Sequence, residues 1–277
     1  MSTFSVYVTY WESDLHAQIT DMIDNDVIKE GVRVILAFAS FNFISSQYIP
    51  GFGNVTIDDV KNIINMVHEV GAEISLSIGG ATYPLHGSDL YTAPDTLAEN
   101  ISGLLENAGF DGVDFDIEDS YNVVPANFAT TAATIITTLR ELQPDLNITL
   151  TTPAQAWLAE MYQRTLLNLT IDSLTAWQPM ESDLVINQGT DYTTQIQYDI
   201  NYYMTEWNVP ADKIILGLMC GPDDEEHVLT LKNALDMTTF AQTEELQGIM
   251  LWEGAIDAQG CLGNAPYAYS LGIQAEL

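Results

Sequence analysis

Three acidic residues alternate with apolar residues in one short segment of the chain. Asp114, Asp116 and Glu118 are separated by Phe115 and Ile117. Because side chains alternate across a β-strand, the three acids share one face of this strand and the apolar residues share the other. In an α/β barrel the apolar face packs against the surrounding helices, so the acids must face the interior. Glu118 then lies at the carboxyl end of the strand, where the active sites of such barrels are found.

A row of three carboxyl groups favours proton chemistry. Like charges at close range raise the pKa of one member, so we expect one of these acids to hold a proton near neutral pH. A glycosidase uses such a carboxylic acid to protonate the leaving oxygen of a sugar. The alternatives are a solvated acidic strand or a calcium loop, but the intervening residues are large and apolar and no glycine stands where a calcium loop turns. The pattern therefore indicates a site for cleaving sugars.

The rest of the chain contains the elements needed to position this strand. Short β-rich runs alternate with segments of helical periodicity, which is the pattern of a parallel sheet with crossover helices. The length of 277 residues is close to the roughly 250 typical of a (β/α)8 barrel. We predict one domain over residues 1–277, a single α/β barrel of the (β/α)8 TIM type without an inserted domain and with an open groove at its mouth. The predicted strands are Phe4–Trp11, Arg33–Phe41, Glu73–Gly79, Gly112–Glu118, Asn147–Thr152, Ser173–Met180, Lys213–Met219 and Gly248–Trp252.

Three of the connecting helices have clear start and stop signals. The segment Thr56–Val70 begins at a capping threonine and ends before Gly71, which suits a left-handed residue. The next helix begins near Pro94 and ends at Gly109, and the third extends from Pro125 to Leu142. The predicted buried stripes are Val60, Ile63, Ile64 and Val67 in the first helix, Leu97, Ile101, Leu104 and Leu105 in the second, and Phe128, Ala132, Ile135 and Leu139 in the third.

The chain is strongly acidic, with 7 Lys and Arg against 39 Asp and Glu and a formal net charge of −32. This charge repels phosphate backbones and anionic lipids, so we expect neither nucleic acid nor membrane partners. It suits a neutral or cationic substrate, an acidic medium or a salty one; a solvated surface without a specific role is the alternative. No apolar run approaches the roughly 18 residues that span a bilayer. We expect a monomer.

Two further features concern the cellular compartment. The N-terminus has neither the basic patch nor the apolar core of a signal peptide, so localisation stays open, with secretion favoured if an export signal was removed. Cys220 and Cys261 follow the predicted seventh and eighth strands and are expected to lie near one another. Two cysteines do not make a disulfide framework, and the sequence leaves their pairing open.

The acidic strand resembles a known signature. Residues 111–118 read DGVDFDIE, which is similar to the DGxDxDxE motif of family 18 glycoside hydrolases, the chitinases and endo-β-N-acetylglucosaminidases. Residues 77–80 (SIGG) resemble the SxGG of that family's third strand, and residues 249–252 (IMLW), with Asp257 beyond, resemble its strand-eight ending. Residues 10–11 resemble the aromatic end of its first strand. The resemblance covers nearly the whole chain.

This resemblance implies a retaining mechanism assisted by the substrate, which is an exception to the usual pair of protein carboxylates. Glu118 is implied as general acid and then base, while the 2-acetamido oxygen of the substrate attacks the anomeric carbon. Asp116 is implied to orient the acetamido group and stabilise the cationic intermediate, and Asp114 to share a proton with Asp116. Trp252 is implied as an apolar floor under the sugar and Tyr10 as a substrate-binding aromatic. Core packing is the alternative for Trp252, and a barrel-lining position without ligand contact is the alternative for Tyr10.

The sequence departs from the family on predicted strand six. The family usually places a tyrosine there that hydrogen-bonds the acetamido carbonyl, in a setting such as MxYD or QxYN. In the first register Met180 and Asp183 match but Ser182 stands at the tyrosine position; in the second Gln178 matches and Met180 replaces the tyrosine. The spacing gives no strong reason for Tyr192 to take its place. Gln178, Met180 and Asp183 stay implied substrate-binding positions, although losing one preorganised donor typically costs about 10²–10³ in rate.

Three functions are compatible with these residues. The leading hypothesis is hydrolysis of β-1,4-linked N-acetylglucosamine polymers or oligomers, with no metal and no organic cofactor. An enzymatic alternative is cleavage within the diacetylchitobiose core of N-glycans by the same acids. A non-enzymatic alternative, prompted by the missing tyrosine, is a chitinase-like lectin or storage protein. Retention of Glu118 argues against an inert protein, since inert relatives commonly lose that acid.

Overall fold

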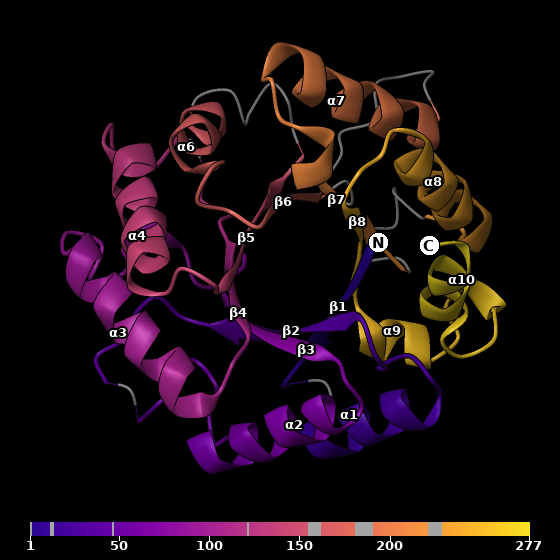
Figure 1. Cartoon of the computed structure of the whole chain (residues 1–277), viewed down its shortest axis with the longest axis horizontal. Helices are drawn as coiled ribbons and strands as arrows, with labels where there is room; N and C mark the ends of the chain where they lie inside the picture. Colours follow the sequence, from indigo (N-terminus) through magenta and orange to yellow (C-terminus); the bar gives the residue numbers. More distant parts are fainter. Residues whose placement is uncertain are drawn as a thin grey trace.

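The computed structural model forms a closed barrel of eight parallel strands in sequential order, β1 to β8, with helices around the outside (Figure 1). It describes residues 2–11, 14–45, 47–120, 122–154, 162–180, 191–220 and 229–277. The predicted (β/α)8 TIM barrel is confirmed. The barrel closes where β1 pairs with β8, from Thr3 opposite Gly248 to Val6 opposite Leu251. The strands are β1 Thr3–Thr9, β2 Val32–Ala39, β3 Glu73–Gly79, β4 Gly112–Asp116, β5 Asn147–Pro153, β6 Ala176–Met180, β7 Ile215–Met219 and β8 Gly248–Trp252.

The helices begin and end largely where local signals predict. Thr56 and Asp59 form a reciprocal capping box at the start of α2, and Gly109 adopts the left-handed conformation at the end of α3 with φ of 92°. The third predicted helix begins three residues late, because a turn in which the Phe128 N–H bonds the Pro125 carbonyl precedes it. The helices are α1 Leu15–Asp24, α2 Ile57–Glu69, α3 Pro94–Ala108, α4 Phe128–Leu142, α6 Gln163–Thr170, α7 Tyr192–Glu206, α8 Leu231–Thr243, α9 Gly254–Ala258 and α10 Ala268–Glu276, with 3₁₀ turns η1 Leu85–Gly87, η3 Ala211–Lys213 and η4 Cys261–Gly263.

Several strands are shorter than predicted. The first ends at Thr9, so Tyr10 and Trp11 stand beyond the sheet. The sixth begins at Ala176 because the preceding residues turn back on Thr170, and the seventh begins at Ile215 because η3 occupies residues 211–213. The fourth strand ends at Asp116, two residues before Glu118.

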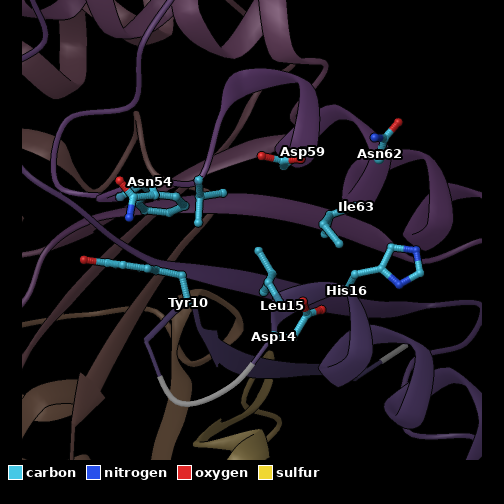
Figure 2. Close-up of a pocket in the computed structure, with 10 residues that line it drawn as sticks. Tyr10, Asp14, Leu15, His16, Asn54, Asp59, Asn62 and Ile63 are labelled. Atoms are coloured by element: carbon cyan, nitrogen blue, oxygen red, sulfur yellow. The ribbon is translucent and has the colours of Figure 1, made fainter.

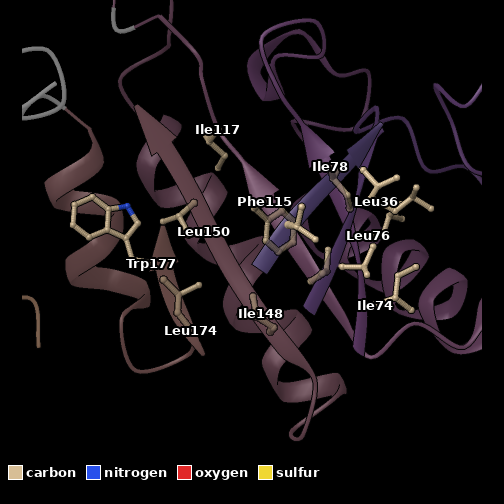
Figure 3. Packing of buried hydrophobic residues seen from close by; sticks show 14 of the residues in the cluster. Leu36, Ile74, Leu76, Ile78, Phe115, Ile117, Ile148, Leu150, Leu174 and Trp177 are labelled. Atoms are coloured by element: carbon tan, nitrogen blue, oxygen red, sulfur yellow. The ribbon is translucent and has the colours of Figure 1, made fainter. Parts of the chain in front are cut away.

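The core has an outer and an inner part. The outer part fills the space between strands and helices and contains the apolar side of the acidic strand, Val113, Phe115 and Ile117. Figure 3 shows Phe115 and Ile117 among their neighbours in this part of the core. All twelve residues of the three predicted helical stripes are buried in it. The inner part lies within the barrel and joins β1, β2, β6, β7 and β8 through Tyr7, Ile35, Ala37, Phe38, Ala176, Ile215 and Met250.

Polar groups hold the last elements in place. The buried Asp257 carboxylate accepts the backbone N–H groups of Tyr269 and Ser270 at 3.1 and 2.8 Å and the Ser270 hydroxyl at 2.7 Å, so it fixes the start of α10. Cys220 and Cys261 are both buried free thiols, and burial raises the pKa of each. No helix in the described part of the chain is long and apolar enough to cross a membrane.

Candidate active site

Asp114 lies at the centre of a polar cluster inside the barrel. Its side chain is fully buried and accepts hydrogen bonds from five side chains on four other strands. Since neighbouring and opposite strands all contribute, these contacts can form only in the lumen. The donors are the Tyr7 and Ser77 hydroxyls on Oδ2, each at 2.7 Å, and Thr149 at 2.7 Å, Thr151 at 2.8 Å and the Gln178 amide at 3.2 Å on Oδ1.

Burial and hydrogen bonding act in opposite directions on the pKa of Asp114. Burial raises the pKa of Asp114, and the hydroxyl donors oppose that rise without cancelling it. A hydroxyl can also accept a hydrogen bond, so the hydroxyl groups of this shell can contact either the ionised or the protonated acid. The pKa of Tyr7 lies well above its usual value because of burial and the nearby carboxylates of Asp114 and Asp116, so the phenol stays a neutral donor.

Glycines bring the neighbouring strand against the acids. A Cβ atom at Gly79 would lie 2.0 Å from the Asp116 carbonyl oxygen, and the Gly80 N–H donates to that same oxygen at 2.9 Å. Gly112 is confined in the same way, with the Asn147 carbonyl oxygen 2.6 Å from a notional Cβ. Only glycine permits this approach, which gives the SIGG and DG segments a physical reason.

Asp116 and Glu118 continue the row from Asp114 towards the barrel mouth. Asp116 is buried, and its carboxylate contributes to the raised pKa of Tyr7. Glu118 is half-buried and stands beyond the last paired residue of β4. The row therefore runs from a closed interior to a partly open end, as alternation along the strand predicted.

Trp252 lies at the carboxyl end of β8 beside the inner apolar cluster. Its ring stacks on Phe38 with centroids 5.6 Å apart and meets Tyr7 edge-on at 5.2 Å. Met180, at the end of β6, packs against the same cluster. Phe38 in turn stacks on Trp11, which is 47% exposed. Three roughly parallel rings thus extend from the lumen to the surface.

Tyr10 is not part of the Asp114 cluster. Its hydroxyl donates to the Gly51 carbonyl at 2.5 Å and its ring stacks on Phe52 at 4.8 Å. It lines a separate pocket of about 490 Å³ between the starts of α1 and α2 (Figure 2). The residue of β1 that reaches Asp114 is Tyr7, which lies three positions before Tyr10 and therefore on the opposite face of the chain, and sequence reasoning missed it.

The three predicted substrate-binding positions on and after strand six, Gln178, Met180 and Asp183, do not all lie together. Gln178 is buried and donates to Asp114 and, at 2.8 Å, to the Thr151 hydroxyl, whereas Met180 is apolar and half-buried. Asp183 and Ser182 lie outside the described residues. Among the residues that the structure describes, no group of three or more His, Cys, Asp or Glu side chains is arranged to hold a metal ion.

Comparison with known proteins identifies the family of this barrel. The model for glycosyl hydrolases family 18 matches residues 3–230. The chain belongs to glycosyl hydrolase family 18. No curated protein sequence matches it.

Solved structures of chitinases and of a pseudo-chitinase share its fold at low sequence identity. A chitinase from Pseudoalteromonas aurantia is 18% identical, with all of both chains covered and a TM-score of 0.78. The catalytic domain of a hyperthermophilic chitinase from Pyrococcus furiosus is 16% identical over 99% of this chain and 94% of that chain, with a TM-score of 0.77. Human YKL-39, described as a pseudo-chitinase with retained chitooligosaccharide binding, is 16% identical over 100% and 99%, with a TM-score of 0.76. Solved structures with this fold therefore include both chitinases and a pseudo-chitinase.

Proposed function

We propose that this family 18 protein hydrolyses β-1,4-linked N-acetylglucosamine oligomers or polymers with retention of configuration. One observation carries the proposal, namely the row of Asp114, Asp116 and Glu118 with its deepest member held by five donors. The shell of hydroxyl groups can hydrogen-bond Asp114 in its ionised or its protonated form, which the proposed sharing of a proton with Asp116 requires.

Each member of the row has a distinct role in the proposed reaction. Glu118, at the partly open end, protonates the glycosidic oxygen and then activates the incoming water. The 2-acetamido oxygen of the sugar attacks the anomeric carbon, and Asp116 orients that group and stabilises the positive charge that develops. Asp114, whose pKa burial raises, takes up a proton when Asp116 needs to be ionised. The reaction as proposed uses no metal and no organic cofactor.

The three stacked rings of Trp252, Phe38 and Trp11 supply a surface for the sugar chain. Trp252 forms the apolar floor at the cleaved unit, and the stack through Phe38 to the exposed Trp11 continues away from it. Pyranose faces carry apolar C–H groups, so ring faces and sugar faces pack well. The ligand class proposed is therefore a poly- or oligosaccharide that contains N-acetylglucosamine.

The proposal is tested with fluorogenic chitobiose and chitotriose substrates. Glu118→Gln should lower kcat by about 10²–10⁴, because the amide cannot donate the proton. Glu141→Gln, an exposed position at the end of α4, serves as the matched control and should leave kcat unchanged. Equal rates for wild type and Glu118→Gln would refute the proposed role.

Met180 favours a second candidate, a chitinase-like lectin. It stands where the family's tyrosine is expected in one register, and it offers no hydroxyl to the acetamido carbonyl. This candidate predicts that wild type and Glu118→Gln are equally silent while both bind chitin. Release of intact glycans from a glycoprotein, with chitin untouched, would instead favour cleavage of N-glycan cores.

A further inference from the structure

Glu118 lies two residues beyond the last residue of β4. The ladder between β4 and β5 ends at Asp116, and the last backbone contact with β5 is the Ile117 N–H to the Thr151 carbonyl at 2.9 Å. Glu118 itself comes after this bond. A general acid must be held close to its productive place, since a misplacement of about 1 Å can cost about 10²-fold in rate.

The next residue is held from two sides. Asp119 is only 4% exposed, and its carboxylate accepts the Leu85 N–H at 3.0 Å and the His86 N–H at 2.9 Å. The His86 ring, through Nδ1, contacts the same carboxylate. On the other side, the Tyr162 hydroxyl donates to the Asp119 carbonyl oxygen at 2.7 Å. Asp119 thus ties the segment after β4 to the turn η1, which lies after β3, and to a residue that lies after β5.

We infer that Asp119 and His86 are positioning residues that fix the backbone of Glu118 through a clamp between the β4 segment and η1. Asp119 is covalently adjacent to Glu118, so a peptide plane fixed at one residue restricts the other. The inference rests on the proposed catalytic role of Glu118.

The surroundings of Tyr162 support this placement. Burial raises the pKa of Tyr162, and the carboxylates of Asp119, Glu118 and Asp116 raise it further. Tyr162 therefore lies within electrostatic reach of the whole row while its hydroxyl is committed to the Asp119 backbone. The clamp and the row belong to one compact region at the barrel mouth.

A merely structural role is the competing explanation, because a buried carboxylate that accepts two backbone N–H groups stabilises any turn. Asp257 offers a matched control of this kind. It also accepts two backbone N–H groups and one side-chain donor, but it does so at the start of α10. Asp119→Asn and Asp257→Asn therefore make the same change at two different places, since each replaces one accepting oxygen by an NH2 group that cannot accept a hydrogen bond.

The experiment compares these two variants with wild type by turnover of fluorogenic chitotriose, by thermal unfolding and by crystal structures. Both variants should unfold at a lower temperature. Only Asp119→Asn should lower kcat, by about 10²-fold with KM nearly unchanged, and shift the Glu118 carboxylate by about 1 Å. Equal losses of kcat in both variants, or an unmoved Glu118 with unchanged kcat in Asp119→Asn, would overturn the inference. A wild type without turnover would refute the proposed function, and the position of Glu118 in the crystal structures would then decide the inference alone.

His86 provides an independent test. His86→Ala removes the ring contact but keeps the backbone N–H, so kcat should fall by about twofold to tenfold. His86→Asn places its Nδ2 where the ring Nδ1 stood, and it should restore most of the lost rate. An asparagine variant as slow as the alanine variant would contradict the role of the ring.

Discussion

At the residue scale, the decisive feature is that the Asp114 carboxylate accepts hydrogen bonds from side chains on four other strands. Asp114 binds donors on β1, β3, β5 and β6, so its cluster can exist only when the barrel is closed. Buried polar networks of this kind are stable only when their members are satisfied together. The site and the integrity of the barrel are therefore coupled through one residue.

Tyr7 gives the clearest prediction at this scale. Tyr7→Phe removes one donor from Asp114 and a 3.2 Å bond to Thr151 but keeps the ring. We expect kcat on fluorogenic chitobiose to fall by about 10–100-fold, because Asp114 loses one of the hydrogen bonds that set its pKa. The unfolding temperature should drop modestly. Tyr269→Phe, which removes an equally buried hydroxyl bonded to the Leu229 carbonyl at 2.8 Å, should lose stability alone. Similar kcat values for Tyr7→Phe and wild type would exclude the proposed role of the phenol.

At the element scale, the fit of β3 against β4 depends on Gly79. Its φ of 121° is strained for other residues, and a Cβ would strike the Asp116 carbonyl at 2.0 Å. Gly79→Ala should lower the free energy of unfolding by more than about 3 kcal/mol. Gly263 also has a positive φ, of 77°, but open space around it, so Gly263→Ala should cost only about 1 kcal/mol. Urea unfolding measures both, and equal losses would show that the clash is relieved elsewhere.

The elements show why sequence reasoning succeeded where it did. Alternation along residues 112–118 and the helical stripes are local patterns, and β3 and β8 have the predicted bounds. The end of a strand depends on the turn that comes next, so β1 ends at Thr9 and not at Trp11. Tyr10 is three residues from Tyr7, so alternation along β1 already directs it to the outer face, where it packs against the outer core. Tyr7 lies 107 residues from its partner Asp114, and no local pattern reports such a contact. Only the inward alternation of β1 offered a hint.

At the scale of the whole molecule, the buried acids and the net charge both make the folded protein less stable as pH rises. Burial raises the pKa of Asp114, Asp199 and Asp257 in the folded protein. Each of these acids therefore contributes stability that is full below its unfolded pKa of about 3.9 and is lost as pH rises through its folded pKa. Asp59 and Asp191, whose pKa values hydrogen bonds lower, act oppositely, but both are exposed. A charge of −32 adds repulsion as pH rises.

We therefore expect the unfolding temperature in low salt to be higher at pH 5 than at pH 8 by about 3 °C or more. Scanning calorimetry at the two pH values measures this difference. Adding sodium chloride should raise the unfolding temperature at pH 8 more than at pH 5, because salt screens the larger charge. A protein that is more stable at pH 8 than at pH 5 in low salt would show that exposed, hydrogen-bonded carboxylates dominate.

The ladder that joins Thr3–Val6 to Gly248–Leu251 bears on how the chain is made. During synthesis β1 leaves the ribosome before the other seven strands of the barrel, and its partner β8 leaves after them. Until then one edge of β1 has no permanent neighbour, and such edges invite pairing with other chains. The nascent protein should therefore be most vulnerable to aggregation before β8 emerges. Tyr7 also becomes enclosed only when β8 completes the barrel.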